Sequence, residues 1–275
     1  MTGDLERPAG GYTLQLSDSE RMRYRMMAAQ ALAEESELWR AAGVVAGAAV
    51  ADVGCGPGAT LVELARLVGP QGRAAGVEPG EAARAAAREE LDGAGFPEAT
   101  VPVVDGSAEA TGLETGAWDC VMVRHVLTHT GGAPPAIVTH LATLLRPGGH
   151  LYLVDTDLDA FRTTPADDAM AEQSRRYSDF HRSLGNDPRM GPRLSALLVD
   201  AGLAVVERQG RWLALPAVLM REGGPLRAAQ EAMVAAGLVA PGEIPGWEAA
   251  RHRFSEIPGA VVWAPFFLAV GRRLA

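Results

Sequence analysis

Cysteine and long hydrophobic runs are both scarce in this sequence. Only Cys55 and Cys120 occur among 275 residues, each in an apolar, strand-like context. This excludes a disulfide framework and predicts buried reduced thiols. No uncharged apolar run reaches the roughly 18 residues of a membrane-spanning helix, and the polar stretch Met1–Gly11 lacks the apolar core of a signal peptide. We therefore expect a cytoplasmic protein with no membrane partner.

Clustered positive charge is missing as well. The 25 Lys+Arg residues are all arginines and are scattered without a run of five, and 34 Asp and Glu residues give a net charge of −9. A nucleic-acid-binding surface is normally basic, so the composition argues against a nucleic-acid partner. The length, with 48% hydrophobic residues, is sufficient for one enlarged globular domain with a sizeable core.

Glycine is abundant, and its most informative use is the stretch Val50–Thr60, VADVGCGPGAT. A short apolar run there ends in Gly54, Gly56 and Gly58, and a helical segment follows at once. Glycines let a ligand lie against the backbone, and a helix start supplies unpaired N–H groups. The stretch predicts a site for a nucleotide-like small molecule. By itself it fits both NAD and S-adenosylmethionine.

Apolar runs alternate with amphipathic helical segments from residue 49 onward. This alternation predicts a parallel β-sheet covered by helices on both faces, with ligands beyond the carboxyl ends of the strands. The expected strands are 49–53, 73–77, 101–104, 119–123, 149–154, 203–208 and 265–271. The expected helices are 19–42, 59–68, 80–94, 133–145, 167–184, 191–201 and 225–238.

The chain divides into a helical lead-in over residues 1–48 and one main domain over 49–275. Two stretches of that domain, 155–190 and 216–260, are longer than ordinary connections between sheet elements. Long insertions at the ligand end of such a sheet commonly cover the site. We expect both stretches to act as lids.

Five stretches resemble motifs of the class I S-adenosylmethionine-dependent methyltransferases. They are VADVGCGPGAT, GRAAGVEPG, WDCVMVRHVLTH, LLRPGGHLYLVD and FFLAVGRRLA, in the order and spacing of that family. The resemblance covers residues 49–155 and, more loosely, 191–275. It implies an α/β, Rossmann-like, doubly wound sheet of seven mostly parallel strands, of which the last is antiparallel.

The resemblance also implies S-adenosylmethionine as the cofactor. Glu78, at the tip of the second strand, is placed to accept both ribose hydroxyls. Asp52 either orients the glycine loop, reaches the cofactor's ammonium through water, or is purely structural. Ser107 stands where the family carries an adenine-binding Asp, and Asp105 is the alternative. The expected cofactor-binding residues are Asp52, Gly54, Gly56, Gly58, Glu78, Ser107, Ala108 and Arg124.

The run after the fourth strand contains the candidate catalytic group. Arg124 and His129 match positions common in the family, and His129 is therefore expected in a structural or cofactor-lining role. His125 lies at the strand tip that faces the transferable methyl group, and a histidine suits proton removal near pH 7. A zinc site at His125 and His129 would lack the metalloprotease glutamate. We predict no bound metal.

Three residues are expected to contact the substrate. Asp155 ends the fifth strand, and Tyr177 and His181 share one helical face at i, i+4 spacing. The alternative for Asp155 is magnesium binding, together with the acids that alternate after it. The alternative for Tyr177 and His181 is plain helix packing. Tyr12 and the Glu20–Arg23 region resemble a family lead-in that folds over the cofactor.

The sequence therefore predicts methyl transfer to O, N or C of a small-molecule acceptor, in specialised metabolism, with a homodimer left open. Two other functions share part of the pattern. A methyltransferase-fold protein could hold the cofactor as a scaffold for another reaction such as cyclisation. An NAD-dependent oxidoreductase would share the glycine loop and Glu78 but not the Arg-Pro-Gly-Gly turn or the closing strand. The Asn/Asp-Pro-Pro-Tyr type of motif found in many nucleic-acid methyltransferases is absent.

Overall fold

The structure is a computed structural model that describes residues 17–222 and 224–274, so Tyr12 lies outside the described residues. Strands and helices alternate along most of the chain. The strands are β1 (Ala49–Val53), β2 (Arg73–Glu78), β3 (Val103–Asp105), β4 (Trp118–Arg124), β5 (Leu145–Thr156), β6 (Arg162–Thr164), β7 (Ala204–Pro216) and β8 (Val261–Arg272). The helices are α1 (Asp18–Ala41), α2 (Ala59–Val68), α3 (Glu81–Gly93), α4 (Pro134–Leu144), α5 (Asp168–Ser183), α6 (Leu194–Asp200), α7 (Leu219–Glu222), α8 (Pro225–Ala228), α9 (Gln230–Ala235) and α10 (Ile244–Ser255).

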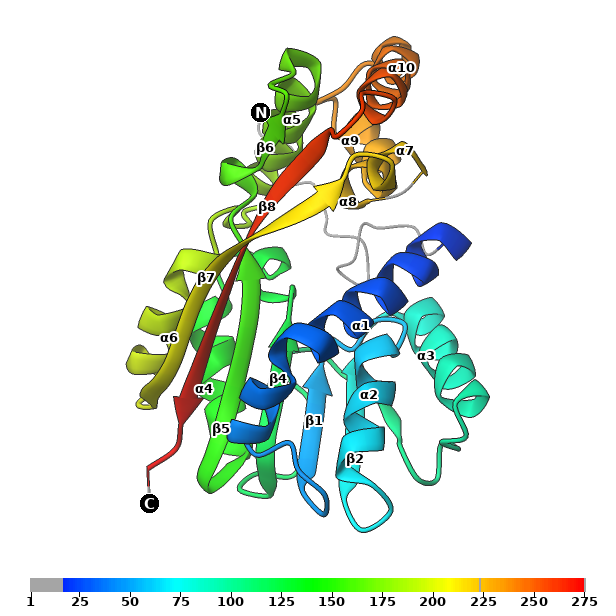
Figure 1. Cartoon of the computed structure of the whole chain (residues 1–275). Coiled ribbons are helices and arrows are strands. Elements are labelled where there is room, and N and C mark those ends of the chain that lie inside the picture. The colour runs from blue at the N-terminus through cyan, green and yellow to red at the C-terminus, as the bar shows by residue number, and fades with distance from the viewer. Residues whose placement is uncertain (1–16, 223, 275) are drawn as a thin grey trace.

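The strands form one eight-stranded sheet in the order β3-β2-β1-β4-β5-β8-β6, with β7 paired to β8 (Figure 1). Strands β1 to β5 are parallel, and β8 is antiparallel to both β5 and β7. All seven predicted strands are present, which confirms the Rossmann-like fold, and the short β6 is added. The chain winds outward from β1 to β3 and returns at β4. The switch point therefore lies between β1 and β4, beside the glycine loop.

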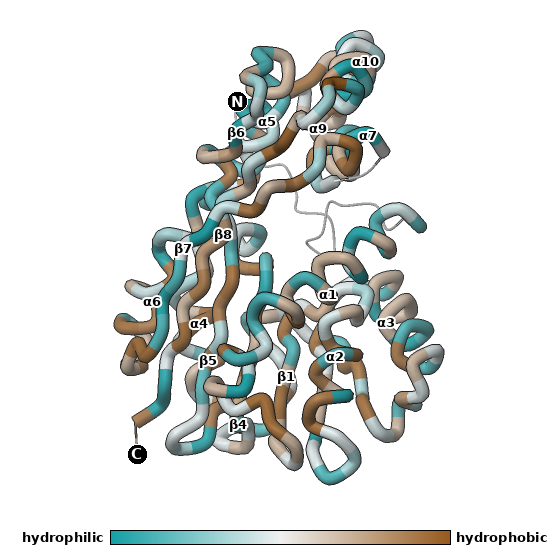
Figure 2. Tube along the Cα trace, viewed as in Figure 1, coloured by the Kyte–Doolittle hydropathy of each residue, from teal (hydrophilic) through white to brown (hydrophobic). Residues whose placement is uncertain are grey.

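Both faces of the sheet are covered, because alternate residues of each strand pack against helices on opposite sides. Val50, Cys120 and Tyr152 belong to the core beneath α1 and α2, whereas Ala51 and Val121 belong to the core beneath α4 and α6. This double burial explains the continuous apolar runs of the sequence. Figure 2 shows hydrophobic stretches along the strands of the sheet. Both cysteines are free and buried, as predicted.

Strands β7 and β8 are longer than predicted. They pair with one another along their whole length, from the pair Ala204–Arg272 to the pair Pro216–Val261. Their far halves extend to the lobe (Figure 1), where β6 pairs with Val261–Trp263 of β8. The expected helix 225–238 is divided into α8 and α9. Helix α10 was missed because its first turn reads Ile-Pro-Gly, although proline is tolerated there since the first-turn N–H has no helical partner.

The two long connections pack together as one lobe beyond the carboxyl ends of the strands (Figure 1). It consists of the 3₁₀ turn η2 (Leu158–Ala160), β6, α5 and α7 to α10. Leu158, Phe180, Met233 and Trp247 share a hydrophobic cluster in this lobe. Segments separated by some 50 residues thus form a single apolar core.

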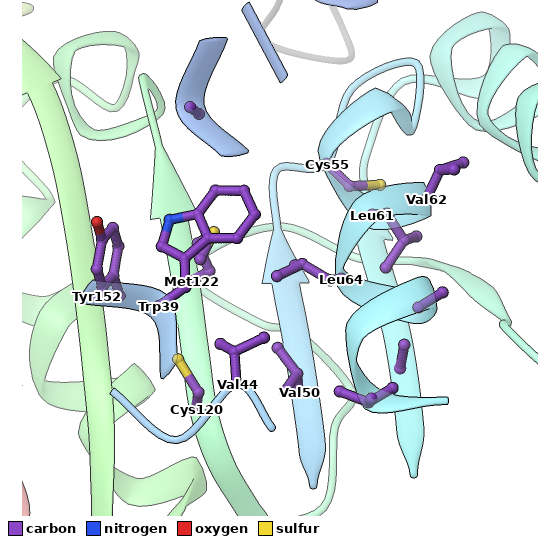
Figure 3. Close-up of a cluster of buried hydrophobic side chains, with 14 of the residues drawn as sticks. Trp39, Val44, Val50, Cys55, Leu61, Val62, Leu64, Cys120, Met122 and Tyr152 are labelled. Atoms are coloured by element: carbon purple, nitrogen blue, oxygen red, sulfur yellow. The ribbon is translucent and has the colours of Figure 1, made fainter. Parts of the chain in front are cut away.

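Helix α1 is attached to the sheet by Glu35, whose side chain is only 5% exposed. The Glu35 carboxylate accepts hydrogen bonds from Arg124 of β4 at 2.5 Å, Tyr152 of β5 at 2.9 Å and Arg211 of β7 at 2.5 Å. One turn further on, Trp39 packs beside Met122 and Tyr152 (Figure 3). Burial alone would raise the pKa of Glu35, but Arg124, Arg211 and the Tyr152 hydroxyl outweigh it and hold the pKa below its usual value.

Replacing Glu35 by glutamine should destabilise the protein strongly. Glu35→Gln leaves Arg124 and Arg211 without their carboxylate, and breaking a buried ion pair from one side costs about 3 kcal/mol. Glu37→Gln, on the exposed side of the same helix, is the matched control and should change the free energy of unfolding little. Urea unfolding at neutral pH measures both. Equal effects of the two substitutions would contradict this role of Glu35.

The same ion pairs predict a pH dependence. Because the folded-state pKa of Glu35 is lowered, its contribution is complete above the unfolded-state value of about 4.5 and is lost as pH falls through the folded-state value. The gap in unfolding free energy between the wild type and Glu35→Gln should therefore shrink from pH 6 towards pH 3. A constant gap would show that the Glu35 charge does not carry the effect.

Candidate functional site

A cavity of about 1670 Å³ lies at the switch point, between the carboxyl ends of the strands, α1 and the lobe. Its wall includes the loops that follow β1, β2, β3 and β4 and residues of α5, α8 and α10. A site for one small ligand commonly measures about 300–1,000 Å³. This cavity therefore has room for two ligands.

The glycine loop reaches the cavity through Gly54 and Gly56, whose φ angles of +75° and +53° disfavour other residues. A Cβ atom on Gly54 would stand 2.4 Å from a methyl group of Val126, so the loops after β1 and β4 touch there. A Cβ atom on Gly56 would meet only the Tyr24 ring, at 3.9 Å. Gly58 is not on the wall. It begins α2 and lies against Ala87 of α3.

Glu78 lies buried on the cavity wall at the end of β2. One carboxylate oxygen accepts the Gly56 N–H at 3.1 Å and the other accepts the Gly80 N–H at 2.9 Å. Burial raises the pKa of Glu78, and both hydrogen bonds and Arg84 act against that rise. Each oxygen keeps a second lone pair. Glu78 can therefore shape the glycine loop and still accept a ligand hydroxyl.

Asp52 presents a buried carboxylate to the cavity, and its Oδ2 atom has no hydrogen-bond partner. Burial raises the pKa of Asp52 to about 7, with Arg124 opposing the rise and Glu78 adding to it. A buried acceptor without a partner costs free energy unless a ligand supplies the donor. An ammonium group is the donor that such a carboxylate fits best.

The two candidates for an adenine contact lie in different environments. Ser107 and Ala108 line the cavity. The Asp105 side chain is 76% exposed and pairs with Arg84 at 2.9 Å, and Asp105 is not among the lining residues. The geometry therefore favours Ser107 over Asp105 as the wall of a base-binding site.

His125 occupies the end of β4 with a φ angle of +57°, which is rare for a residue other than glycine. Its ring lies edge-on to Phe266, with centroids 5.0 Å apart, and its buried Nε2 atom has no partner. Burial, Arg124, Arg23 and His129 all lower the pKa of His125 well below its usual value. The imidazole is therefore neutral at pH 7. Neighbouring Arg124 also lines the cavity, but Glu35 holds its guanidinium.

The three predicted substrate contacts differ in what they offer. Asp155 lines the cavity, but its oxygens accept hydrogen bonds from the Thr128 N–H, the Thr128 hydroxyl and the Thr156 N–H. This carboxylate thus holds the 3₁₀ turn η1 (Leu127–His129) on β5. Tyr177 is buried and lines the cavity.

The prediction for His181 is not supported by the geometry. His181 is buried and is not among the lining residues. Its ring packs 4.7 Å from Tyr177 and 5.0 Å from His129, so the i, i+4 pair supports the wall instead of presenting both rings to a ligand. Burial, with a smaller effect of His129, lowers the pKa of His181 to about 3.

Several cavity residues carry no signal in the sequence. Glu35, Arg211, Ser178 and Arg251 line the cavity, yet each depends on partners distant in the chain or lies in a stretch without a motif. Among the described residues, four buried side-chain polar atoms have no partner: Asp52 Oδ2, His125 Nε2, Ser178 Oγ and Arg251 Nε. All four belong to residues of the cavity wall. Unpaired polar groups therefore concentrate where a ligand would lie.

Within the described residues, no group of three or more His, Cys, Asp or Glu side chains is arranged to hold a metal ion. Of the acids that follow β5, Asp155 is bonded to Thr128 and Asp159 is paired with Arg182. Over the same residues, no helix has the length and apolar character needed to cross a membrane.

The sequence of residues 51–153 matches the family model of the methyltransferase domain. This part of the chain is therefore similar to methyltransferase domains. The match and the fold bear out the resemblance that links the chain to S-adenosylmethionine, and they set aside the NAD-dependent oxidoreductase. The matched domain contains the glycine loop, Glu78, His125 and the start of the fifth strand.

Two relatives each match about half of the chain. An uncharacterised 37.1 kDa protein in transposon TN4556 of Streptomyces fradiae is 31% identical over 58% of this chain and 44% of its own length. A ubiquinone biosynthesis O-methyltransferase from Xanthomonas oryzae pv. oryzae is 35% identical over 48% of this chain and 51% of its own length. The chain thus spans about half the length of both relatives.

The fold of most of the chain is similar to that of solved proteins. A Bacillus halodurans C-125 protein proposed to be a methyltransferase superposes with a TM-score of 0.59 at 19% identity. The match covers 88% of this chain and 100% of that protein. At this identity the likeness concerns the fold.

Contact between the glycine loop and Val126 can be tested through stability. Gly54→Ala should lower the free energy of unfolding by about 1–3 kcal/mol more than Gly47→Ala. Gly47 has a similar φ of +84° but nothing within 4 Å of an added Cβ atom, so it controls for backbone strain alone. Chemical denaturation measures both variants.

A second substitution separates the steric effect from other causes. Val126→Ala removes the two methyl groups that lie nearest to an added Cβ atom on Gly54. Combined with Gly54→Ala it should recover most of the additional loss. Strict additivity of the two substitutions would show that the loops do not meet as described.

Proposed function

We propose that the protein transfers a methyl group from S-adenosylmethionine to a small-molecule acceptor bound under the lobe. The observation that carries this proposal is the cavity itself. It joins the glycine loop, Glu78 and the unpaired Asp52 carboxylate at one end to the apolar interior of the lobe at the other. Its volume of about 1670 Å³ suits a cofactor and an acceptor together.

The residues at the sheet end fit the cofactor by their chemistry. Glu78 would accept the ribose hydroxyls, Asp52 would receive the ammonium group, and the bare backbone at Gly54 and Gly56 would lie against the methionine chain. Ser107 would border the adenine. When bound, the cofactor supplies a methyl group that is already electrophilic because it is attached to a sulfonium.

The protein's part in the reaction is alignment and exclusion of water. Helix α1 and the lobe enclose the cavity, and Phe266 and His125 form its wall at the end of β4. Because burial keeps His125 neutral, its ring can take a proton from the acceptor, but its lowered pKa makes it a weak base. It therefore suits an acceptor that loses its proton readily, such as a phenol, or one that needs no base.

The acceptor is proposed to be of moderate size and partly apolar, as expected in specialised metabolism. The lobe side of the cavity is lined by Phe161, Met170, Leu213, Leu215, Met220, Leu226 and Val262. Burial of apolar surface against such side chains stabilises a bound ligand. The net charge of −9 disfavours nucleic acid as the acceptor.

Glu78→Ala should weaken binding of S-adenosylmethionine by about 1–3 kcal/mol, because the ribose hydroxyls lose their acceptor. Calorimetry measures the affinity, with the exposed Glu81→Ala as control. Glu78 also supports the glycine loop, so an analogue without ribose hydroxyls is needed. The affinity for this analogue should differ much less between Glu78→Ala and the wild type than the affinity for S-adenosylmethionine does. A loss of the same size for cofactor and analogue would leave Glu78 as a loop support only.

Asp52 predicts a pH-dependent affinity. With a pKa of about 7 in the free protein, its carboxylate is fully charged only above that pH, and only the charged form pairs with an ammonium group. The affinity for S-adenosylmethionine should therefore rise from pH 5.5 towards pH 7, and binding below pH 7 should release protons. Asp52→Asn should bind more weakly and lose this slope. An identical slope in Asp52→Asn would assign the pH dependence to another group.

A further inference from the structure

Arg251 of α10 is a buried cation on the lobe side of the cavity, with 3% of its surface exposed. Its Nη1 atom donates a hydrogen bond to the side-chain amide oxygen of Gln173, in α5, at 2.8 Å. The Gln230 amide of α9, oriented with its oxygen towards Arg251, accepts from both terminal nitrogens at 3.0 and 3.1 Å. Two neutral amides thus orient the guanidinium, but they carry no charge of their own to compensate it.

No carboxylate among residues 17–221 and 224–274 forms an ion pair with Arg251, and its Nε atom has no hydrogen-bond partner. Burial and then Arg227, a second cation of the cavity wall, lower the pKa of Arg251, and the Glu248 carboxylate acts against them more weakly. Arg227 itself is only 4.0 Å from Glu248. A buried charge is normally paired, and Glu248 acts on Arg251 without forming an ion pair with it. Among the described side chains, the guanidinium therefore has no anion bound directly to it.

The buried atoms without partners form two groups. Asp52 and His125 are at the sheet end of the cavity, which the cofactor and the reacting atom of the acceptor would occupy. Ser178 and Arg251 belong to α5 and α10 of the lobe, where no part of the cofactor is placed. A cofactor at the sheet end would therefore leave the buried Arg251 Nε atom without a partner.

The two ends are connected along β8. Phe266 touches the His125 ring, whereas Val262 packs with Phe254 of α10, one turn beyond Arg251. Four residues of extended strand span about 13 Å. Between these positions the wall is apolar, with Leu213, Leu215 and Ala264 among the lining residues. A molecule that reaches both ends has an apolar body of roughly this length.

We propose that Arg251 anchors an anionic group, a carboxylate or a phosphate, at the end of the acceptor remote from the methylated atom. A guanidinium binds such groups through two parallel hydrogen bonds. The acceptor is then an elongated amphipathic anion. This inference deepens the proposed function and rests on it for the assignment of the cavity to the acceptor.

Probe binding tests the subsite without any turnover. The protein saturated with S-adenosylhomocysteine is titrated with decanoate, decyl phosphate and decan-1-ol, which share one apolar chain. The wild type should bind at least one anionic probe about tenfold more tightly than the alcohol, and the better anion identifies the preferred group. Equal binding of all three, or no binding of either anion, overturns the proposal.

Two arginine variants test whether Arg251 causes the preference for an anionic probe. Arg251→Gln should abolish the preference for the anion, whereas Arg253→Gln removes the same charge from an exposed position on the same helix and should preserve it. The same preference in both variants overturns the proposal. If circular dichroism shows that Arg251→Gln is unfolded, Arg251→Lys is used and should keep a reduced preference; an undiminished one overturns the proposal.

The same samples separate this inference from the proposed function. Binding of S-adenosylhomocysteine is measured first, before any probe is added, and should be equal in the wild type and both arginine variants. A wild type that does not bind S-adenosylhomocysteine contradicts the proposed function. A wild type that binds it but ignores the charge of the probe contradicts only the anionic subsite.

Discussion

The buried carboxylate of Glu35 is the contact on which the site depends. It joins α1 to β4, β5 and β7 through Arg124, Tyr152 and Arg211, three side chains that no local pattern relates to it. Without a carboxylate at this position, two arginines beside the sheet would lack a counter-charge. The contact holds α1 beside the carboxyl ends of the strands, where the helix becomes one wall of the cavity. It also explains why Arg124, although on the cavity wall, has little left to offer a ligand.

The second constraint is the lobe formed by two distant connections. It has its own apolar core, and Glu20 of α1 accepts the Gly224 N–H at its edge, so α1 contacts both the sheet and the lobe. The cavity consequently has a polar end at the glycine loop and an apolar end with one buried arginine. This division suits a reaction between two different ligands, of which the sheet end would hold the cofactor.

Burial determines the chemistry that the site can support. It raises the pKa of Asp52 and lowers that of His125, so both tend towards their neutral forms before a ligand arrives. The cavity thus keeps unpaired polar atoms at Asp52, His125 and Arg251 that a ligand can satisfy. A weak buried base is adequate when the methyl donor is already activated and the acceptor is acidic or neutral.

The sequence by itself determined the sheet, the glycine loop and the positions of Glu78 and Asp52, because strand and turn chemistry act over a few neighbouring residues. It predicted all seven family strands and the place of the switch point. It could not determine that Asp155 and His181 are engaged by neighbouring groups, since helical spacing does not say which face is covered. Nor could it find Glu35 or Arg251. Their roles arise from contacts across 21 to 176 positions of the chain, and only the packing of α1 and the lobe on the sheet brings those partners together.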